Sequence, residues 1–243
     1  MKAVVVSENG CIFSAVSAPH NQYATTMDYR ALKELVRRGE NQQIEFKLKV
    51  NHPEKIIREV VAFANTDGGF LFIGVNDDLT IPGLNYADGD LYLLERAIQK
   101  FCFPAIPYTL ERIPLYDERE VLVFRIPPSH NRPHYVVFDS EKPDEKKAYV
   151  RVADKSVQAS KEMREILKGE RADRSVRFSY GDKERVLMQY LNQHQTITVD
   201  LFANIANVPR KIASRTLVLL VLANILQIHP NEVTDRYTSR TGL

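Results

Sequence analysis

Three carboxylates in the first third of the chain are the residues best suited to chemistry. Glu40 and Glu45 lie five positions apart, and Asp77 follows a short apolar run. If the three converge, they can hold Mg²⁺ or Mn²⁺, and such an ion stabilises charge on a phosphate during in-line displacement. The alternative is that Glu45 pairs with Lys47 across a sheet and that Asp77 finishes the turn after a strand. No cofactor is expected unless the carboxylates form this metal site.

A second set of candidates is basic and lies on expected strands and loops. It comprises Lys47, Lys49, Arg125, His130, Arg132, His134, Arg151 and Lys155. Alternation along a strand places its charged members away from the core, so neighbouring strands would present one basic surface that suits phosphates. The alternative is an ordinary solvated face, because Lys and Arg are mostly exposed in any protein.

The elements that must position the carboxylates alternate between strand and helix. Residues 42–49 alternate apolar and charged side chains, which predicts a half-buried strand. Pro53 begins a segment with the 3.6-residue period of an amphipathic helix. Residues 65–69 end that helix, since a glycine at 68 or 69 can adopt the left-handed conformation. Residues 70–75 are almost all apolar, which predicts a central strand covered on both faces.

Short motifs run through and beyond this stretch. They are Glu40-x4-Glu45-Phe46-Lys47, Phe63-Ala64-Asn65-Thr66-x-Gly68-Gly69, Leu71-x-Ile73-Gly74-Val75-x-Asp77, Gly83, Ser129 with Arg132-Pro133, and Tyr149-x-Arg151. Together they resemble the AlbA-like domain of the Schlafen family over about residues 26–168. The resemblance implies an α+β fold with a mixed sheet and packed helices, and a domain that binds nucleic acid or a ligand.

The same resemblance implies an alternative activity for the carboxylates. In some eukaryotic Schlafen proteins, residues at the positions of Glu40, Glu45 and Asp77 form a three-carboxylate RNase site. A metal-dependent nuclease is therefore the first alternative, although Asn41 stands where Ser is common in the family. There is no G-x4-G-K-[S/T] motif, and the glycines follow a helix instead of preceding one, which argues against a P-loop ATPase.

The chain divides into four parts by its patterns. We expect an N-terminal arm over residues 1–25, the AlbA-like domain over 26–168, a polar basic linker over 169–181 and a small winged helix-turn-helix domain over 182–243. Within the AlbA-like domain, further helices are expected at 27–38, 88–103 and 161–168. Further strands are expected at 108–114, 120–126, 134–138 and 148–153.

The C-terminal part predicts three helices and a wing. The helices are expected at 182–193, 198–205 and 209–223, with a wing from 225–228 and 232–238. The segment I-A-N-V-P-R-K-I-A-S-R-T-L is similar to the turn and recognition helix of bacterial winged-helix regulators. Arg210, Lys211 and Arg215 would then face the major groove, with plain helix surface as the alternative.

An apolar stripe on this last helix conflicts with a purely DNA-reading role. Val218, Leu219 and Leu222 lie opposite the core side, and an apolar stripe there should be covered. We expect a subunit contact or cover by the N-terminal arm. The competing interpretation is a winged helix used for dimerisation without DNA reading.

Composition sets the remaining limits. The 243 residues are 44% hydrophobic and 26% charged with a net charge of +2, so any nucleic-acid binding must come from clustered cations. Two cysteines and the lack of a long apolar run predict a cytoplasmic protein without a membrane span. The combined prediction is a homodimeric transcriptional regulator that binds nucleic acid, double-stranded DNA in particular. It is expected not to be an enzyme, and the alternatives are the nuclease and a dimerisation or interaction module without DNA binding.

Overall fold

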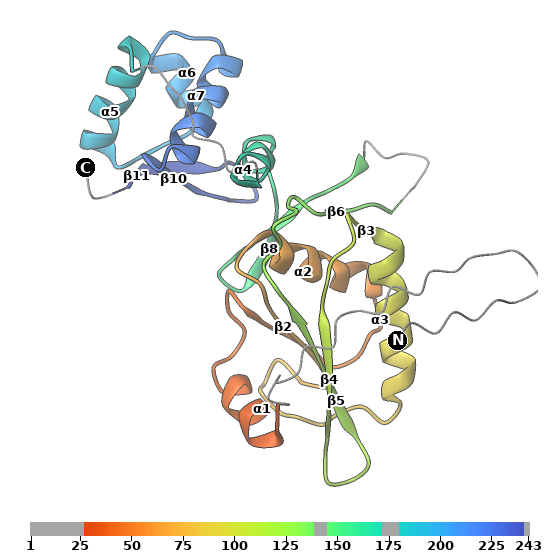
Figure 1. The fold of residues 1–243 in the computed structure, drawn as a ribbon. Helices are drawn as coiled ribbons and strands as arrows, with labels where there is room; N and C mark the ends of the chain where they lie inside the picture. The colour runs from red at the N-terminus through yellow and green to blue at the C-terminus, as the bar shows by residue number, and fades with distance from the viewer. Residues whose placement is uncertain (1–26, 139–144, 172–179, 241–243) are drawn as a thin grey trace, which may run out of the picture.

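The computed structural model describes residues 27–138, 145–171 and 180–240. Two modules pack against each other (Figure 1): a larger one of mixed sheet and helices, and a smaller one that follows residue 180. The predicted arm over 1–25 and most of the predicted linker lie outside the described residues. No helix in the described ranges has both the length and the apolar content that a membrane crossing requires.

Within residues 27–138 and 145–171, the larger module contains four helices and eight short strands. Its helices are α1 Tyr29–Val36, α2 Pro53–Asn65, α3 Ala87–Phe101 and α4 Lys161–Arg171. Its strands are β1 Ile44–Lys47, β2 Gly69–Ile73, β3 Cys102–Phe103, β4 Thr109–Pro114, β5 Glu120–Ile126, β6 Tyr135–Val136, β7 Tyr149–Val152 and β8 Lys155–Gln158. This is the predicted α+β class, and α4 continues three residues past the expected end of the closing helix.

The main sheet has the strand order β1-β2-β5-β4, with β1 parallel to β2 and the other pairs antiparallel. Strand β2 therefore lies inside the sheet, as its nearly all-apolar sequence predicts. Both of its faces are covered, because one apolar cluster joins the sheet to α2 and α3 and a second joins the opposite face to α1. Strands β7 and β8 form a separate hairpin that packs on α2.

The turn between α2 and β2 shows why the double glycine stands there. Gly68 has φ +74° and its amide donates to the Phe63 carbonyl, which ends the helix in the expected left-handed conformation. A Cβ on Gly68 would lie 2.6 Å from the Ile126 carbonyl oxygen. A side chain at position 68 is therefore disfavoured both by the positive φ and by the clash with this carbonyl oxygen.

The smaller module contains three helices and a three-stranded sheet. Its elements are α5 Asp182–His194, β9 Thr196–Ile197, α6 Val199–Ile205, α7 Arg210–Leu222, β10 Leu226–His229 and β11 Arg236–Ser239. The sheet order is β10-β11-β9, all antiparallel, and one apolar cluster joins the sheet to the three helices. Thr198 caps α6 with its hydroxyl, which accepts from the Leu201 amide.

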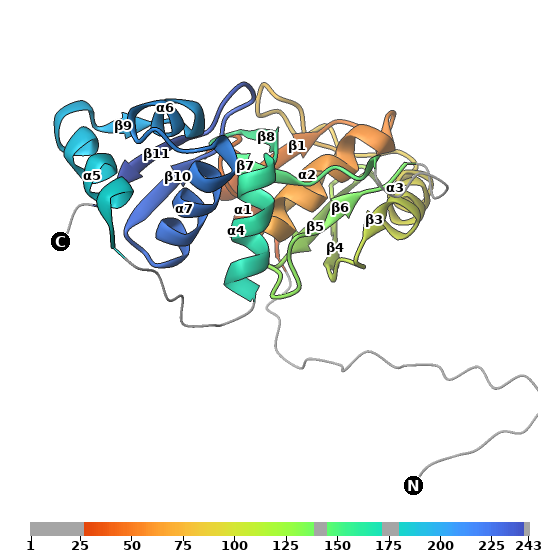
Figure 2. The ribbon, with the colours of Figure 1, turned by 90° about the horizontal axis from the view of Figure 1, so that it is seen from above.

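The two modules meet through α4, which lies beside α7 (Figure 2). The Ser214 hydroxyl of α7 donates to the Glu162 carboxylate of α4 at 2.6 Å, and both residues are buried. Ser160, which directly precedes α4, donates to Asp235, which precedes β11. The first contact ties α7 to the larger module, and the second ties the segment before β11 to it.

Candidate nucleic-acid interface

The first predicted carboxylate, Glu45, belongs to a buried ion network. Its side chain is 7% exposed, and Arg151 Nη1 lies 2.9 Å from one carboxylate oxygen while Lys47 contacts the other. The Arg151 side chain is fully buried, lies 2.6 Å from Glu59 of α2 and donates to the Asn41 carbonyl. Strand β1, helix α2 and the β7–β8 hairpin are thus tied together by one guanidinium.

The other two carboxylates do not join Glu45 around a shared centre. Glu40 accepts from the Phe46 amide at 2.8 Å and lies 4.0 Å from Lys47, whose ammonium sits between Glu40 and Glu45. Asp77 is exposed and lines a pocket beside Lys47. Among the residues that the structure describes, no three acidic, histidine or cysteine side chains gather closely enough to hold a metal ion. The donor set does not fit Mg²⁺ or Mn²⁺, because cations already occupy the Glu45 oxygens.

Burial changes the acidity of the network. It raises the pKa of Glu40, and the nearby charges of Glu45 and Asp77 act in the same direction. It also raises the pKa of Glu59, with a further contribution from Glu45. Both carboxyls therefore hold a proton at a higher pH than an exposed glutamate does.

The single basic surface expected on the sheet is not formed, and this prediction is wrong. Register places Lys47 opposite Ile73 on the face that carries α2, and Arg125 opposite Phe70 on the face that carries α1. Arg151 stands on a separate hairpin and is buried, so it cannot reach a phosphate. An alternating sequence tells which residues share a face of one strand, but not which face a neighbouring strand presents.

The remaining basic candidates of this module also have individual environments. Arg132 pairs with Glu170 at 3.0 Å. His134 is buried between the Pro104 carbonyl and the Ser129 hydroxyl, and burial lowers its pKa, so the expectation that it contributes to a basic surface is wrong. His130 and Lys155 are exposed.

A basic pocket nevertheless opens where β1 ends and α2 begins. Its volume is about 430 Å³, and its charged lining consists of three lysines, His52 and one acidic residue, Asp77. The lysines are Lys47, Lys49 and Lys55. Lys49 and Lys55 are exposed and make no ion pair with any described residue, so their charges are available to an anion. The first turn of α2 adds the positive end of a helix dipole to the same place.

Sequence reasoning did not select His52, Lys55 or Glu59. Lys55 and Glu59 belong to α2, where a charged residue normally faces solvent, so periodicity alone gives no sign of their role. The signal for Lys55 and His52 was their position around Pro53, since a predicted helix start is a place where anions bind.

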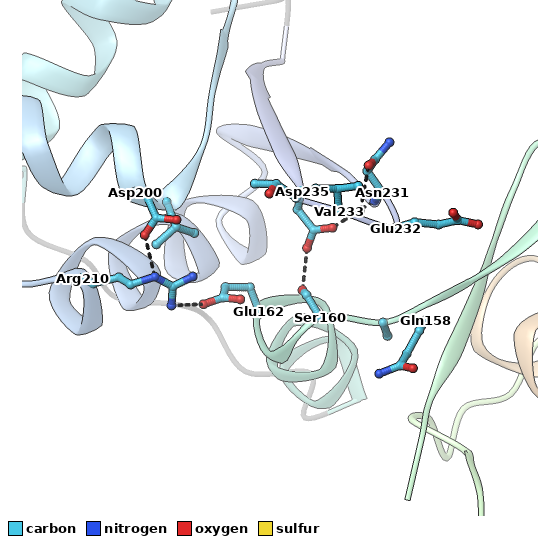
Figure 3. Close-up of a pocket in the computed structure, with 12 residues that line it drawn as sticks. Gln158, Ser160, Glu162, Asp200, Arg210, Asn231, Glu232, Val233 and Asp235 are labelled. Carbon is cyan, nitrogen blue, oxygen red and sulfur yellow. Dashed lines mark hydrogen bonds and ion pairs between the residues drawn. The ribbon is translucent and has the colours of Figure 1, made fainter.

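The three basic residues of α7 that were predicted to contact DNA differ in their ion pairs. Arg210 is 61% exposed but points back to carboxylates, with Asp200 at 2.6 Å and Glu162 at 4.0 Å (Figure 3). The hydrogen bond that Arg210 Nε donates to the Asp200 carboxylate raises the pKa of Arg210. Lys211 and Arg215 are exposed and make no ion pair with described residues. Of the three expected contacts, these two have their charges available.

The cover of the apolar stripe on α7 also differs from the expectation. Val218 is 9% exposed and packs toward α4, and a Cβ on Gly169 of α4 would lie 2.4 Å from Leu222. Helix α4 of the same chain therefore covers part of this stripe, and the arm expected to cover it lies outside the described residues. Leu219 and Leu222 remain partly exposed.

Comparison with known proteins gives a match to one family model and structural likenesses that cover part of the chain. The sequence model of the family described as Schlafen, AlbA_2 matches residues 40–160. The crystal structure of the DIP2311 protein from Corynebacterium diphtheriae is 20% identical with a TM-score of 0.39, over 55% of this chain and 28% of that one. The solution structure of the N-terminal domain of a RecG-related protein from Nitrosomonas europaea is 23% identical with a TM-score of 0.36, over 43% of this chain and 77% of that one.

Proposed function

Residues 40–160 of this chain belong to the Schlafen AlbA_2 family, and from this premise we propose that the protein binds nucleic acid through the pocket at the start of α2. Membership indicates a nucleic-acid-related function. The observation that carries the proposal is the pairing of a 430 Å³ pocket with the available charges of Lys49 and Lys55 beside a helix start. Cations so placed neutralise phosphates and release condensed counterions, which is the main sequence-independent source of affinity.

The second half of the proposal concerns residues 182–240, which we propose to be a winged helix-turn-helix. It is supported by the order α5-β9-α6-α7 followed by the β10–β11 hairpin, and by the short turn between α6 and α7. Lys211 and Arg215 are the phosphate contacts on α7. A protein with both modules would act as a transcriptional regulator on double-stranded DNA, and a homodimer would require a palindromic site.

The nuclease alternative has weaker support from the geometry. Glu45 is neutralised by Lys47 and Arg151, and a metal ion would have to displace both cations. We therefore propose binding without a catalytic step at Glu40, Glu45 and Asp77. The test is incubation of the wild type and of Glu45→Gln with Mn²⁺ and labelled RNA. We expect no Mn²⁺-dependent cleavage by the wild type that is lost in Glu45→Gln.

The proposal is tested by fluorescence anisotropy with labelled duplex DNA and the full chain at low salt. The variant Lys49→Ala/Lys55→Ala should bind at least about tenfold more weakly, since each phosphate contact contributes to a steep electrostatic affinity. The matched control is Arg96→Ala/Lys100→Ala on the exposed side of α3, which removes the same charge elsewhere. Equal losses in both variants would mean that net charge, and not the pocket, governs binding.

A further inference from the structure

A groove of about 510 Å³ runs between α4 and α7, and it shares no lining residue with the pocket of Figure 3. Its α4 wall comes from residues 161, 165, 168 and 169, and its α7 wall comes from residues 211–222 at spacings of three and four. Each wall is thus one face of a helix. The α7 wall spans about 16 Å, or three helical turns at 1.5 Å per residue.

The floor of the groove is apolar. Leu219 and Leu222 are partly exposed there, and Val218, which is buried, also lines it. Gly169 lets Leu222 approach the backbone of α4, which brings the floor close to both helices. A partly exposed pair of leucines on the outer side of a helix is suited to contact with another apolar surface.

The rim of the groove is basic. Lys161, Lys168, Lys211 and Arg215 border it, and the acidic residue among the lining side chains is Glu165, which pairs with Lys168 at 2.9 Å. Lys161, Lys211 and Arg215 make no ion pair with a described residue. Four cations against one carboxylate give the rim a positive charge that an occupant must complement.

We propose that this groove docks an acidic amphipathic helix of a partner protein. An amphipathic helix presents apolar residues at spacings of three and four to such a floor, while flanking Asp and Glu meet the basic rim. A nucleic-acid backbone offers no comparable apolar face to Leu219 and Leu222. The inference goes beyond the proposed nucleic-acid function but shares Lys211 and Arg215 with it.

The internal and N-terminal segments outside the described residues do not supply an acidic amphipathic helix. Residues 1–26 contain one acidic residue, Glu8, and one basic residue, Lys2. Residues 172–179 contain Asp173 together with Arg174 and Arg177. Residues 139–144 do have an acidic excess, with Asp139, Glu141 and Asp144 against Lys142, but they are six residues long and contain Pro143 and no leucine, isoleucine, valine or methionine. Because none of these segments combines an acidic excess with an apolar helical face, charge complementarity favours a partner in trans.

The test measures anisotropy of three labelled peptides of about 18 residues, long enough for the helical span of the groove. The first carries Leu at helical spacings with flanking Glu, the second carries Lys in place of Glu, and the third carries Ser in place of Leu. The full chain should bind the first saturably with one peptide per chain, and the other two at least about tenfold more weakly. Leu219→Glu and Lys211→Glu/Arg215→Glu should each weaken binding of the first peptide by a similar factor.

Controls separate this site from the proposed DNA contacts. Arg96→Glu/Lys100→Glu on α3 should leave peptide binding unchanged, and Lys49→Ala/Lys55→Ala should weaken duplex DNA but not the peptide. Circular dichroism confirms that Leu219→Glu is folded, and the milder Leu219→Ser replaces it if it is not. The proposal would be overturned if the peptide with Glu did not bind, or if the peptides with Glu and with Lys bound equally well. It would also be overturned if the wild type had the mass of a dimer and Leu219→Glu the mass of a monomer.

Discussion

Replacing Arg151 by methionine tests whether Glu45 is held in a structural ion network. The guanidinium is fully buried and bonds to Glu45, to Glu59 and to the Asn41 carbonyl, while its plane lies over the Phe63 ring. Methionine keeps much of the apolar stem but leaves two carboxylates facing each other without their shared cation.

The expected loss follows from what remains around those carboxylates. Removing one partner of a buried ion pair costs about 3–5 kcal/mol, because the other charge is left uncompensated. Lys47 still contacts Glu45, and Ser156 still donates to Glu59, so we expect a value near 3 kcal/mol, the lower end of that range. The second variant Glu45→Gln/Arg151→Met should lose less than the sum of its two single changes, since it removes the charge that was left unpaired.

The measurement is urea unfolding of the full chain followed by far-ultraviolet circular dichroism. Arg125→Met is the matched control, because that arginine is exposed and lies over the Phe70 ring, a contact that contributes about 0.5–1 kcal/mol. Substitutions away from buried networks change the free energy of unfolding by less than about 1 kcal/mol. If Arg151→Met unfolds with a free energy that close to the wild-type value, the reasoning is refuted and Glu45 is available for other chemistry.

Three further changes probe other parts of the molecule. Gly68→Ala should lower the free energy of unfolding by at least about 2 kcal/mol, because Gly68 has a left-handed backbone and a Cβ there would meet the Ile126 carbonyl oxygen. Its control, Gly89→Ala, lies in open space on α3 and should raise the free energy of unfolding by about 0.5–1 kcal/mol. Chemical denaturation measures both variants, and a Gly68→Ala protein as stable as the wild type would contradict the prediction. Because burial raises the folded-state pKa of Glu40, the folded protein binds this proton more tightly than the unfolded chain does. The wild type should therefore lose stability relative to Glu40→Gln as pH rises from the ordinary value of 4.5 through the raised pKa, and stability curves that stay parallel as pH rises above 4.5 would argue against it. Ser214→Ala should lower the free energy of unfolding by about 1–3 kcal/mol, because the buried Glu162 carboxylate loses the hydroxyl that donates to it. If the thermal melting curves of the variant and the wild type coincide, this contact does not hold α7.

Much of the larger module follows from periodicity in the sequence. The nearly all-apolar run after the double glycine predicts a strand covered on both faces, and β2 lies between β1 and β5 with helices on each side. Pro53 begins α2, and Gly68 follows its end with a positive φ, both as expected from backbone preferences. These features depend on local conformation and on one burial pattern each, which a sequence carries directly.

The arrangement of the charged residues could not be derived in the same way. Glu45 and Lys47 share a face because they are two positions apart on β1, but their contact with Arg151 depends on where the β7–β8 hairpin packs on α2. Lys47 and Arg125 fall on opposite faces because of strand register, a tertiary property. The cover of Val218 by α4 likewise depends on how two modules dock, which the pattern of either helix alone does not contain.

The most direct test of nucleic-acid binding through the pocket is the salt dependence of affinity for a duplex of mixed sequence. Each phosphate that the protein neutralises contributes about 0.9 to the slope of log K against log salt concentration. We expect a steep slope for the full chain and a slope flatter by about 2 for Lys49→Ala/Lys55→Ala. The account is contradicted by undetectable binding at about 50 mM salt, where phosphate contacts are strong, or by a slope that the double variant leaves unchanged.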